Sequence, residues 1–525
     1  MKKRSLIIPF LVLPALFSLS ACKNPFKKEE EIVVTDATID VVSSLKINLT
    51  KQTTKKLYPK LSVTSVKDPV FLYESSNNSV ATVSSDGTVT GVSEGEAKVT
   101  ITLKINTSIK KEVNVRVVNE SVDALDYTLM FYMCGSTLEY NKPTTPDNDH
   151  QFFTKDIEEM LSVSGMPDSV KIIIQTGGTK HWFMDSSKLE GATKISATNL
   201  QRWEVNGETH KLKLIETLST NYMAKESEFS DFLSWGLDDY EASQMGVVIS
   251  GHGGGIAGCA YDDNYTYKYG DNYYDYTLRT FEVANAAKVA LSNSSKDKFT
   301  WIGYDCCLMQ CADIASINAD YFDYMVASQE NELATGWDHD YYLPTLYSNP
   351  TVSPSSLLPM ICDGFVADNH SDSEPVSKAC LQTLSVLNLS YAQTFVNAFN
   401  TMSAAIGTNK LSYLFVKERF EDSYNKFGDS MFGLCDLKSL LDELSSHSVN
   451  TSAVEDAIAV GHLVMYKKNC SKYSTIPCGI NAFFPEYLGE RGYDLQVGKE
   501  DYNNPLATKL TSWQTMCVNN GTFGW

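Results

Sequence analysis

The sequence is short of basic charge and of metal-binding spacings, and each shortage excludes a class of protein. Its 525 residues include 44 lysines and arginines against 64 aspartates and glutamates, which gives a formal net charge of −20. No long basic stripe interrupts this acidic balance, so nucleic acid is not an expected partner. The 8 histidines form no HxxxH pair, and paired CxxC segments and EF-hand spacings are absent. We therefore predict no cofactor and assign no metal.

Long apolar runs are also scarce. The one apolar run at the start, Leu6 to Leu19, follows a positively charged KKR segment and is shorter than the roughly 20 residues that span a bilayer. It ends in the segment LSAC, which resembles the lipobox of bacterial lipoproteins. The resemblance implies that residues 1–22 are a signal peptide, that Cys22 is diacylated, and that the protein is exported and membrane-anchored, facing the cell surface or the periplasm. A plain secretory signal with a chance cysteine is the alternative.

Cysteine is plentiful, which in an exported chain suggests disulfides whose pairing the sequence leaves open, while the irregular spacing disfavours a zinc site. If Cys22 carries lipid, the 12 cysteines leave 11 others, which is an odd number. Exported proteins use cysteine pairs for stability, so an unpaired thiol is a candidate for chemistry.

The length predicts more than one domain. Residues 23–32 are charged and lack periodicity, as in a tether. Residues 33–118 contain short β-branched runs separated by polar turns, with Asp86-Gly87 placed as a hairpin turn, which predicts an all-β sandwich. The segment SSNNSVATV at 75–83 and the glycines after it resemble the group 2 bacterial immunoglobulin-like repeat.

From 125 to 525 the pattern changes to apolar runs of strand length that alternate with helix-compatible stretches. This alternation predicts an α/β domain with a mostly parallel sheet flanked by helices. In such sheets the ligand site lies beyond the carboxyl ends of the strands. The predicted strands are Leu129–Met133, Val170–Ile174, Gly246–Ile249, Phe299–Ile302, Tyr324–Ala327 and Ile480–Phe484, and the predicted helices include Lys155–Val163, Glu228–Leu237, Leu278–Leu291, Ala392–Met402 and Ser452–Met465.

Two of these strand ends carry groups suited to nucleophilic chemistry. His252 stands among glycines directly after one strand, and Cys306-Cys307 follow another. Each motif alone has an ordinary structural explanation, since a Gly-His-Gly loop is common and cysteine is often buried. Together they match the need of a thiol for a neighbouring base. They lie 55 residues apart, about one strand-helix-strand crossover, which places both at the same edge of a parallel sheet. We also expect a helix start near Cys307 to stabilise its thiolate.

The segments SGHGG at 250–254 and DCCLM at 305–309 resemble the two signatures of clostripain-family cysteine peptidases. TLMFYM at 128–133, ASQE at 327–330 and GWD at 336–338 add to the resemblance, which spans residues 125–525. It implies the caspase-hemoglobinase fold and a cysteine endopeptidase that acts on peptides or proteins.

The resemblance also implies roles for individual residues. Cys307 matches the nucleophile and His252 its partner in a Cys-His dyad, while the backbone N–H groups of Gly253 and Cys307 match the oxyanion hole. Asp305 matches the acidic residue that binds Arg or Lys before the scissile bond. Cys306 departs from the family pattern and leaves the choice between the two cysteines open, although we interpret Cys306 and Cys311 as core residues.

Some family members cut themselves between the His and Cys strands, and some use calcium. Lys268 is the one basic residue in the polar segment 261–271, which we expected to be an exposed loop, so it is the candidate for autoprocessing; an ordinary solvated lysine is the alternative. Calcium stays unassigned.

Two other functions fit parts of this sequence. The first is a surface adhesin or binding lipoprotein with an inactive peptidase-like domain, which the presence of both His252 and Cys307 disfavours. The second is a thiol amidase for small amides, which Asp305 disfavours because its carboxylate suits a basic peptide side chain.

Overall fold

The computed structural model describes residues 34, 37–121, 124–141, 150–269, 272–367, 382–407, 426–427, 433–470, 476–483 and 504–519. The predicted signal peptide with Cys22 and the predicted tether at 23–32 lie outside these residues. Among the residues that are described, no helix has both the length and the apolar character needed to span a membrane.

The N-terminal part is the predicted all-β sandwich. A four-stranded sheet in the order β2-β9-β8-β5 and a three-stranded sheet in the order β3-β7-β6 enclose a core of alternating aliphatic residues. The turn at Asp86-Gly87 joins β6 and β7, and Gly87 has a φ of +85°, which favours glycine. The strands are β1 (Ile39–Asp40), β2 (Ser44–Asn48), β3 (Thr54–Lys56), β4 (Lys60–Leu61), β5 (Phe71–Ser75), β6 (Ala81–Val83), β7 (Thr88–Gly91), β8 (Gly95–Leu103) and β9 (Lys110–Val118).

The second part is built on a ten-stranded sheet in the order β12-β14-β13-β11-β10-β15-β18-β19-β20-β23. The neighbours from β11 to β19 are all parallel, as predicted, and antiparallel pairs occur only toward the two edges. The central strands are β10 (Leu125–Cys134), β11 (Val170–Gly177), β15 (Ala242–Ser250), β18 (Phe299–Asp305) and β19 (Phe322–Ala327). The outer strands are β12 (Leu189–Glu190), β13 (Gln201–Asn206), β14 (Lys211–Thr217), β20 (Thr383–Asn388) and β23 (Val464–Asn469).

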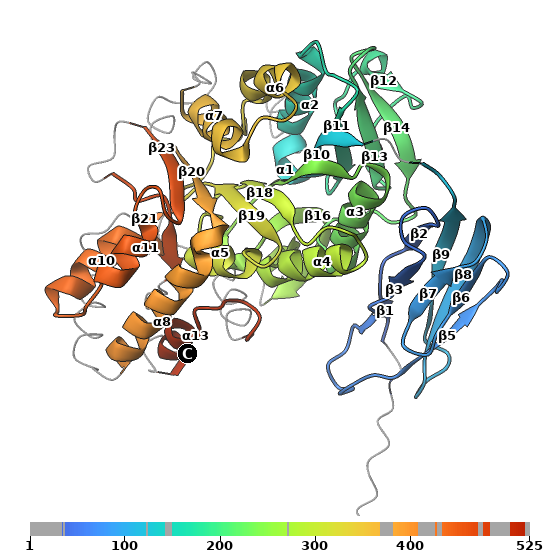
Figure 1. Cartoon of the computed structure of the whole chain (residues 1–525), viewed down its shortest axis with the longest axis horizontal. Coiled ribbons are helices and arrows are strands. Elements are labelled where there is room, and N and C mark those ends of the chain that lie inside the picture. The colour runs from blue at the N-terminus through green and yellow to red at the C-terminus, as the bar shows by residue number, and fades with distance from the viewer. Residues whose placement is uncertain are drawn as a thin grey trace, which may run out of the picture.

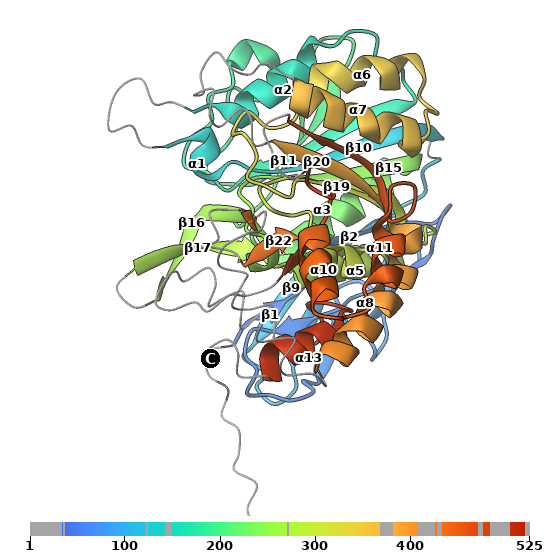
Figure 2. The same ribbon diagram turned by 90° about the vertical axis from the view of Figure 1, so that its left-hand side faces the viewer.

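Helices cover both faces of this sheet, so its central strands are buried on both sides (Figures 1 and 2). One face carries α2 (Phe152–Ser162), α6 (His339–Ser348) and α7 (Pro354–Ala367). The other face carries α3 (Glu226–Asp239), α4 (Thr280–Ser292), α5 (Ala312–Asn318) and α8 (Ala392–Gly407). Three further helices pack on the same side: α10 (Leu437–Ser446), α11 (Ser452–Ile458) and α13 (Thr511–Asn519). A small sheet of β21 (Lys426–Phe427), β22 (Leu434–Asp436) and β24 (Asn481–Phe483) completes this layer.

The predicted helix Ser452–Met465 is wrong in its second half. Helix α11 ends at Ile458, and the chain turns at Gly461, which has a φ of +99°. Val464 then begins β23, the edge strand. A left-handed glycine stops a helix because other residues rarely adopt that conformation, so the apolar spacing across it was misleading.

The sandwich contacts the α/β domain at α3 (Figure 1). Lys46 pairs with Asp239 at 2.5 Å, and Lys55, which is almost fully buried, pairs with Asp238. At the other end of the helix, Lys60 pairs with Glu226. The sandwich therefore supplies cations for carboxylates at both ends of α3.

Candidate active site

The structure brings the two predicted strand ends together. Strands β15 and β18 are parallel neighbours, and Ser250 stands opposite Asp305 in their register. His252 and Cys307 each follow this pair by two residues, so both lie just beyond the same edge of the sheet. Both are partly exposed, so a ligand can reach them. The crossover argument from the sequence is confirmed.

Gly253 packs directly against the cysteine turn. A Cβ atom placed on Gly253 would lie 2.3 Å from the carbonyl oxygen of Cys307 and 2.9 Å from Cβ of Cys306. Real Cβ atoms do not approach that closely, so only glycine fits here. The glycines around His252 thus allow the two loops to touch, which is the close approach that the sequence suggested.

The imidazole of His252 is held from a third strand end. Its Nε2 lies 2.9 Å from Oγ1 of Thr137, a residue of the short helix α1 (Ser136–Glu139) that follows β10. The carbonyl of Thr137 also bonds Nδ1 of His150 at 2.9 Å. Burial, and then the neighbouring His150, lower the pKa of His252 to about 4. The imidazole is therefore neutral near pH 7 and able to accept a proton.

The thiol of Cys307 accepts a hydrogen bond from the backbone N–H of Glu332 at 3.3 Å. Burial raises its pKa to about 11; the Glu332 hydrogen bond opposes this rise, and the nearby Glu330 and Asp305 add to it. Helix α5 begins only at Ala312. Our expectation of a helix start that stabilises the Cys307 thiolate is therefore wrong, and the resting thiol is protonated.

The two neighbouring cysteines serve the core, as we interpreted them. Cys306 is only 1% exposed, and its thiol donates a hydrogen bond to the carbonyl of Ile249 at 3.3 Å. Cys311 is fully buried at the start of α5. Cys306, Cys307 and Cys311 form no disulfide in the described part of the chain.

The two loops that carry the predicted oxyanion-hole donors touch each other. Gly253 and Cys307 are in van der Waals contact. Across the part of the chain that the structure describes, no other residue accepts a hydrogen bond from the N–H of either one. Donors without a partner beside a nucleophile can bind the oxygen of a tetrahedral intermediate.

Asp305 is nearly buried beside the site, and burial raises its pKa to about 6. Glu332 lies against both Asp305 and Cys307; burial and these two neighbours raise its pKa well above the usual range. Both carboxylate oxygens of Glu332 are buried, and they face Asp305 and Trp337. Asp305 does not cap α5, whose first turn follows Cys311. Two carboxylates, those of Asp305 and Glu332, thus lie beside the thiol, one more than the sequence indicated.

The segment 261–271 around Lys268 is not the loop that we expected. Residues Cys259–Tyr269 form β16, which pairs with β17 (Asn272–Leu278) in an antiparallel hairpin (Figure 2). The rings of Tyr267 and Tyr276 lie 4.9 Å apart, and such cross-strand aromatic contacts stabilise a hairpin. Lys268 lies near the turn of this hairpin and is exposed.

Sequence reasoning missed Thr137 and Glu332, and it gave no role to Gln329. The side chain of Gln329 bonds Asp436, Gly479 and Asn481, so it ties the segment after β19 to the C-terminal region. This segment supplies the Glu332 N–H that binds Cys307. The strand-end rule could have found Thr137, because β10 lies next to β15 in the sheet.

The geometry of these residues agrees with a sequence comparison. The profile described as the clostripain family matches residues 144–517, which is most of the chain. The chain belongs to the clostripain family. It is a cysteine peptidase, and peptides or proteins are its substrates. The profile of the group 2 bacterial Ig-like domain matches residues 34–113, in agreement with the sandwich.

A solved structure supports the fold. A secreted C11 cysteine protease from Bacteroides thetaiotaomicron, "iotapain", is 16% identical with a TM-score of 0.51, covering 74% of this chain and 99% of that chain. An inactive zymogen C11 protease from Parabacteroides distasonis is 16% identical with a TM-score of 0.49, covering 73% of this chain and 97% of that chain. A comparison with curated protein sequences gives no match.

Proposed function

We propose that this clostripain-family enzyme cleaves peptide bonds after Arg or Lys through a dyad of Cys307 and His252. The observation that carries the proposal is the matched position of the two residues, each two residues beyond the registered pair Ser250 and Asp305. Both side chains are partly exposed, whereas Cys306 is buried, and this supports Cys307 as the nucleophile.

The resting dyad is neutral, which sets the order of the proton transfers. As the Cys307 sulfur attacks the scissile carbonyl, its proton passes to His252, whose low pKa leaves the imidazole free to accept it. The carbonyl oxygen becomes an oxyanion held by the N–H groups of Gly253 and Cys307. His252 then returns the proton to the leaving amine. Water, deprotonated by the same imidazole, hydrolyses the thioester and restores the thiol.

The two carboxylates beside the thiol support the proposed specificity. Asp305 and Glu332 are carboxylates in a largely dehydrated place, where a negative charge is costly unless a cation meets it. The guanidinium of Arg or the ammonium of Lys, placed just before the scissile bond, supplies that cation. Neutral and acidic side chains would leave the carboxylates unpaired and are rejected.

Autoprocessing after Lys268 is part of the proposal. Its support is the exposed position of Lys268 near the turn of a two-stranded hairpin between His252 and Cys307. A cut there would leave both catalytic strands in the sheet. Incubation of the purified protein should give two fragments that separate after Lys268, and Lys268→Ala should stay intact. Fragments from any other position, with Lys268 uncut, would contradict this part.

Export and a lipid anchor at Cys22 complete the proposal, supported by the signal-like first 22 residues. Cys22→Ser should lose membrane partition, because a buried acyl chain contributes about 0.8 kcal/mol per methylene. Unchanged partition of the variant would contradict the anchor.

The activity itself is tested with a fluorogenic peptide library that varies the residue before the scissile bond. Arg and Lys substrates should be cleaved, with little turnover of neutral or acidic ones. Cleavage without preference for basic residues would overturn the specificity and leave the peptidase assignment intact. Loss of cleavage in Cys306→Ala but not in Cys307→Ala would overturn the dyad.

A further inference from the structure

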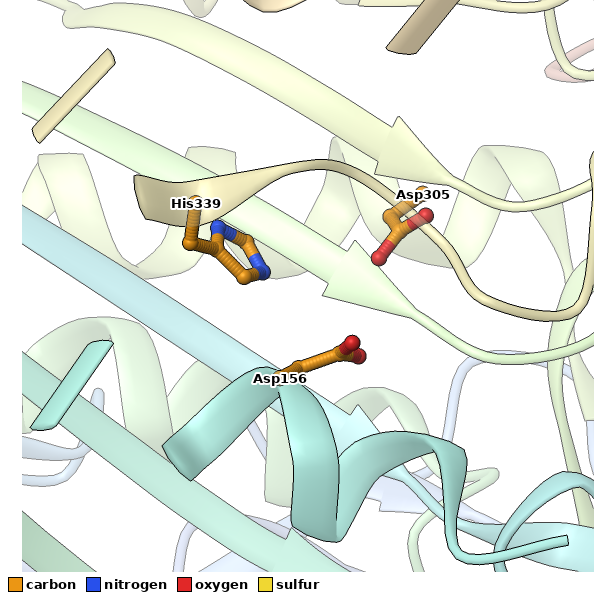
Figure 3. A group of neighbouring side chains, drawn as sticks. All are labelled: Asp156, Asp305 and His339. Atoms are coloured by element: carbon orange, nitrogen blue, oxygen red, sulfur yellow. The ribbon is translucent and has the colours of Figure 1, made fainter. Parts of the chain in front are cut away.

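A second group of ionisable side chains lies beneath the active site, on the side of the sheet covered by α2 and α6. Asp156 comes from α2, Asp305 ends β18, and His339 is the first residue of α6 (Figure 3). Each offers one ligand atom, and the three atoms all lie within 4.8 Å of one another. The side chains are 1%, 5% and 0% exposed, respectively. Three segments far apart in the sequence thus converge on one closed point.

The atoms that face this point lack partners. Oδ2 of Asp156, Oδ2 of Asp305 and Nε2 of His339 are buried without a hydrogen bond in the described part of the chain. Buried polar atoms are nearly always satisfied, and each orphan costs on the order of 1–3 kcal/mol. Three buried polar atoms that face one point without hydrogen bonds are better explained by one shared ligand than by three unrelated losses.

The charge balance points to a cation. Two carboxylates are buried here, and no ion pair between described residues reaches either of them. Lys155 is the next residue before Asp156, but its ammonium lies over the ring of Phe152, 5.5 Å from the ring centre.

His339 is arranged as a metal ligand would be. Its Nδ1 lies 2.9 Å from the hydroxyl of Tyr342, one turn along α6, and its ring packs edge-on against Phe131 at 5.2 Å. These contacts fix the ring, and with the proton on Nδ1 the lone pair of Nε2 faces the carboxylates. Histidines that bind metals are usually held at the second nitrogen in this way.

We propose that Asp156, Asp305 and His339 bind one divalent transition-metal ion of the zinc type. A donor set of one imidazole nitrogen and two carboxylate oxygens suits Zn²⁺ and its first-row neighbours. Calcium takes six to eight oxygens and magnesium keeps a nearly octahedral shell of oxygens, so neither fits a closed site with an imidazole.

The ion would connect the loop that carries Cys307 to helices α2 and α6. Asp305 lies two residues before Cys307, and its two ligand partners belong to α2 and α6. A bound ion therefore links both helices to the end of β18 and holds the Asp305 backbone in place. Asp305 would serve the ion and the substrate pocket from different sides of one carboxylate. Asp156 and His339 have no part in the proposed cleavage, so they carry the test.

The test is metal content and thermal stability, in the full chain with Cys307→Ser to remove zinc bound at the catalytic thiol. Protein produced with Zn²⁺ should hold about one zinc per chain after desalting. Removal by a chelator should lower the Tm, and added Zn²⁺ should restore it. Asp156→Asn and His339→Gln should each lower the zinc content tenfold or more. Asp340→Asn, which changes the exposed residue next to His339, should keep the zinc and the Tm shift.

Three results would overturn the site. One is a chain without zinc whose Tm does not respond to Zn²⁺, which would mean that Asp156 and Asp305 share a proton instead. The second is zinc that persists unchanged in Asp156→Asn and His339→Gln, folded variants included, which would place the metal elsewhere. The third is a Tm that responds to Ca²⁺ and not to Zn²⁺. Asp156→Asn keeps the side-chain shape, and the chelator experiment on the unchanged cluster needs no substitution that could prevent folding.

Discussion

At the contact between the sandwich and the peptidase domain, the carboxylates of α3 are matched by lysines of the same chain. Asp238 meets Lys55 and Asp239 meets Lys46. Beneath the active site, Asp305 and Asp156 are more deeply buried, yet no described lysine or arginine pairs with them. The first arrangement is complete and joins two domains. The second lacks such partners, and we propose that its cations come from outside: a substrate side chain on one side and a metal ion on the other.

The largest effect is expected when the carboxylate of Asp305 beside the active site is neutralised. Asp305→Asn should lower kcat/KM for an arginyl substrate roughly 30-fold or more, because losing one partner of a buried charge pair costs at least about 2 kcal/mol. A small neutral alkylating agent should still label Cys307. Asp340→Asn is the control and should keep full activity. If Asp305→Asn reduced cleavage of basic and neutral peptides equally, the carboxylate would have a structural role only.

The second prediction concerns how the reactivity of the Cys307 thiol depends on pH. Since the pKa of Cys307 is raised to about 11 and that of His252 is lowered to about 4, no thiolate–imidazolium pair forms in the free enzyme. The rate of alkylation by iodoacetamide should therefore rise about tenfold per pH unit between pH 6 and 9. A rate that is level across this range would reveal a preformed ion pair and contradict the neutral dyad.

Substitutions at the ion pairs between the sandwich and α3 should change stability rather than activity. Lys55 is 5% exposed and Asp238 is 18% exposed, so Lys55→Met leaves a poorly hydrated carboxylate at the domain contact. We expect a loss of about 2 kcal/mol in the stability of the docked state, visible as a lower Tm of the sandwich. Lys98→Met, which breaks an exposed pair with Glu112, should change little. Equal effects of the two variants would mean that the domain contact does not depend on the buried pair.

The smallest effect concerns the border of the site. Thr137→Val removes the hydroxyl that holds Nε2 of His252 and should lower kcat about fivefold, equivalent to about 1 kcal/mol for one hydrogen bond. KM should stay unchanged, and Thr137→Ser should restore the rate. A loss that Ser does not rescue would assign the effect to packing.

The parts of the fold that could be predicted are those with a local signature. The central strands are long apolar runs, and the Gly87 turn and the two strand-end motifs follow directly from short segments. The hairpin β16–β17 was taken for a loop because its stability comes from cross-strand tyrosines, which no local rule for loops anticipates. Strands β13 (QRWEVN) and β14 (KLKLIET) were missed because charged and polar residues interrupt their apolar pattern.

The active site likewise has a part that the sequence predicts and a part that it does not. The meeting of His252 and Cys307 follows from one crossover between parallel strands, so the sequence was enough. The approach of Asp156 and His339 to Asp305 depends on how α2 and α6 pack on the sheet, and neither residue stands in a motif. The helix-dipole prediction for Cys307 was wrong because a turn with Leu308 at a φ of +69° separates the thiol from α5.

The central claim is that Cys307, paired with His252, performs the cleavage while the adjacent Cys306 only fills the core. The most direct measurement is the turnover of an arginyl fluorogenic peptide by Cys307→Ala, Cys306→Ala and His252→Ala, with folding checked by Tm. Cys307→Ala should be inactive, His252→Ala should lose activity on the order of hundreds-fold or more, and Cys306→Ala should retain most of it. Turnover that survives in Cys307→Ala, or that is lost equally in a folded Cys306→Ala, would contradict the account.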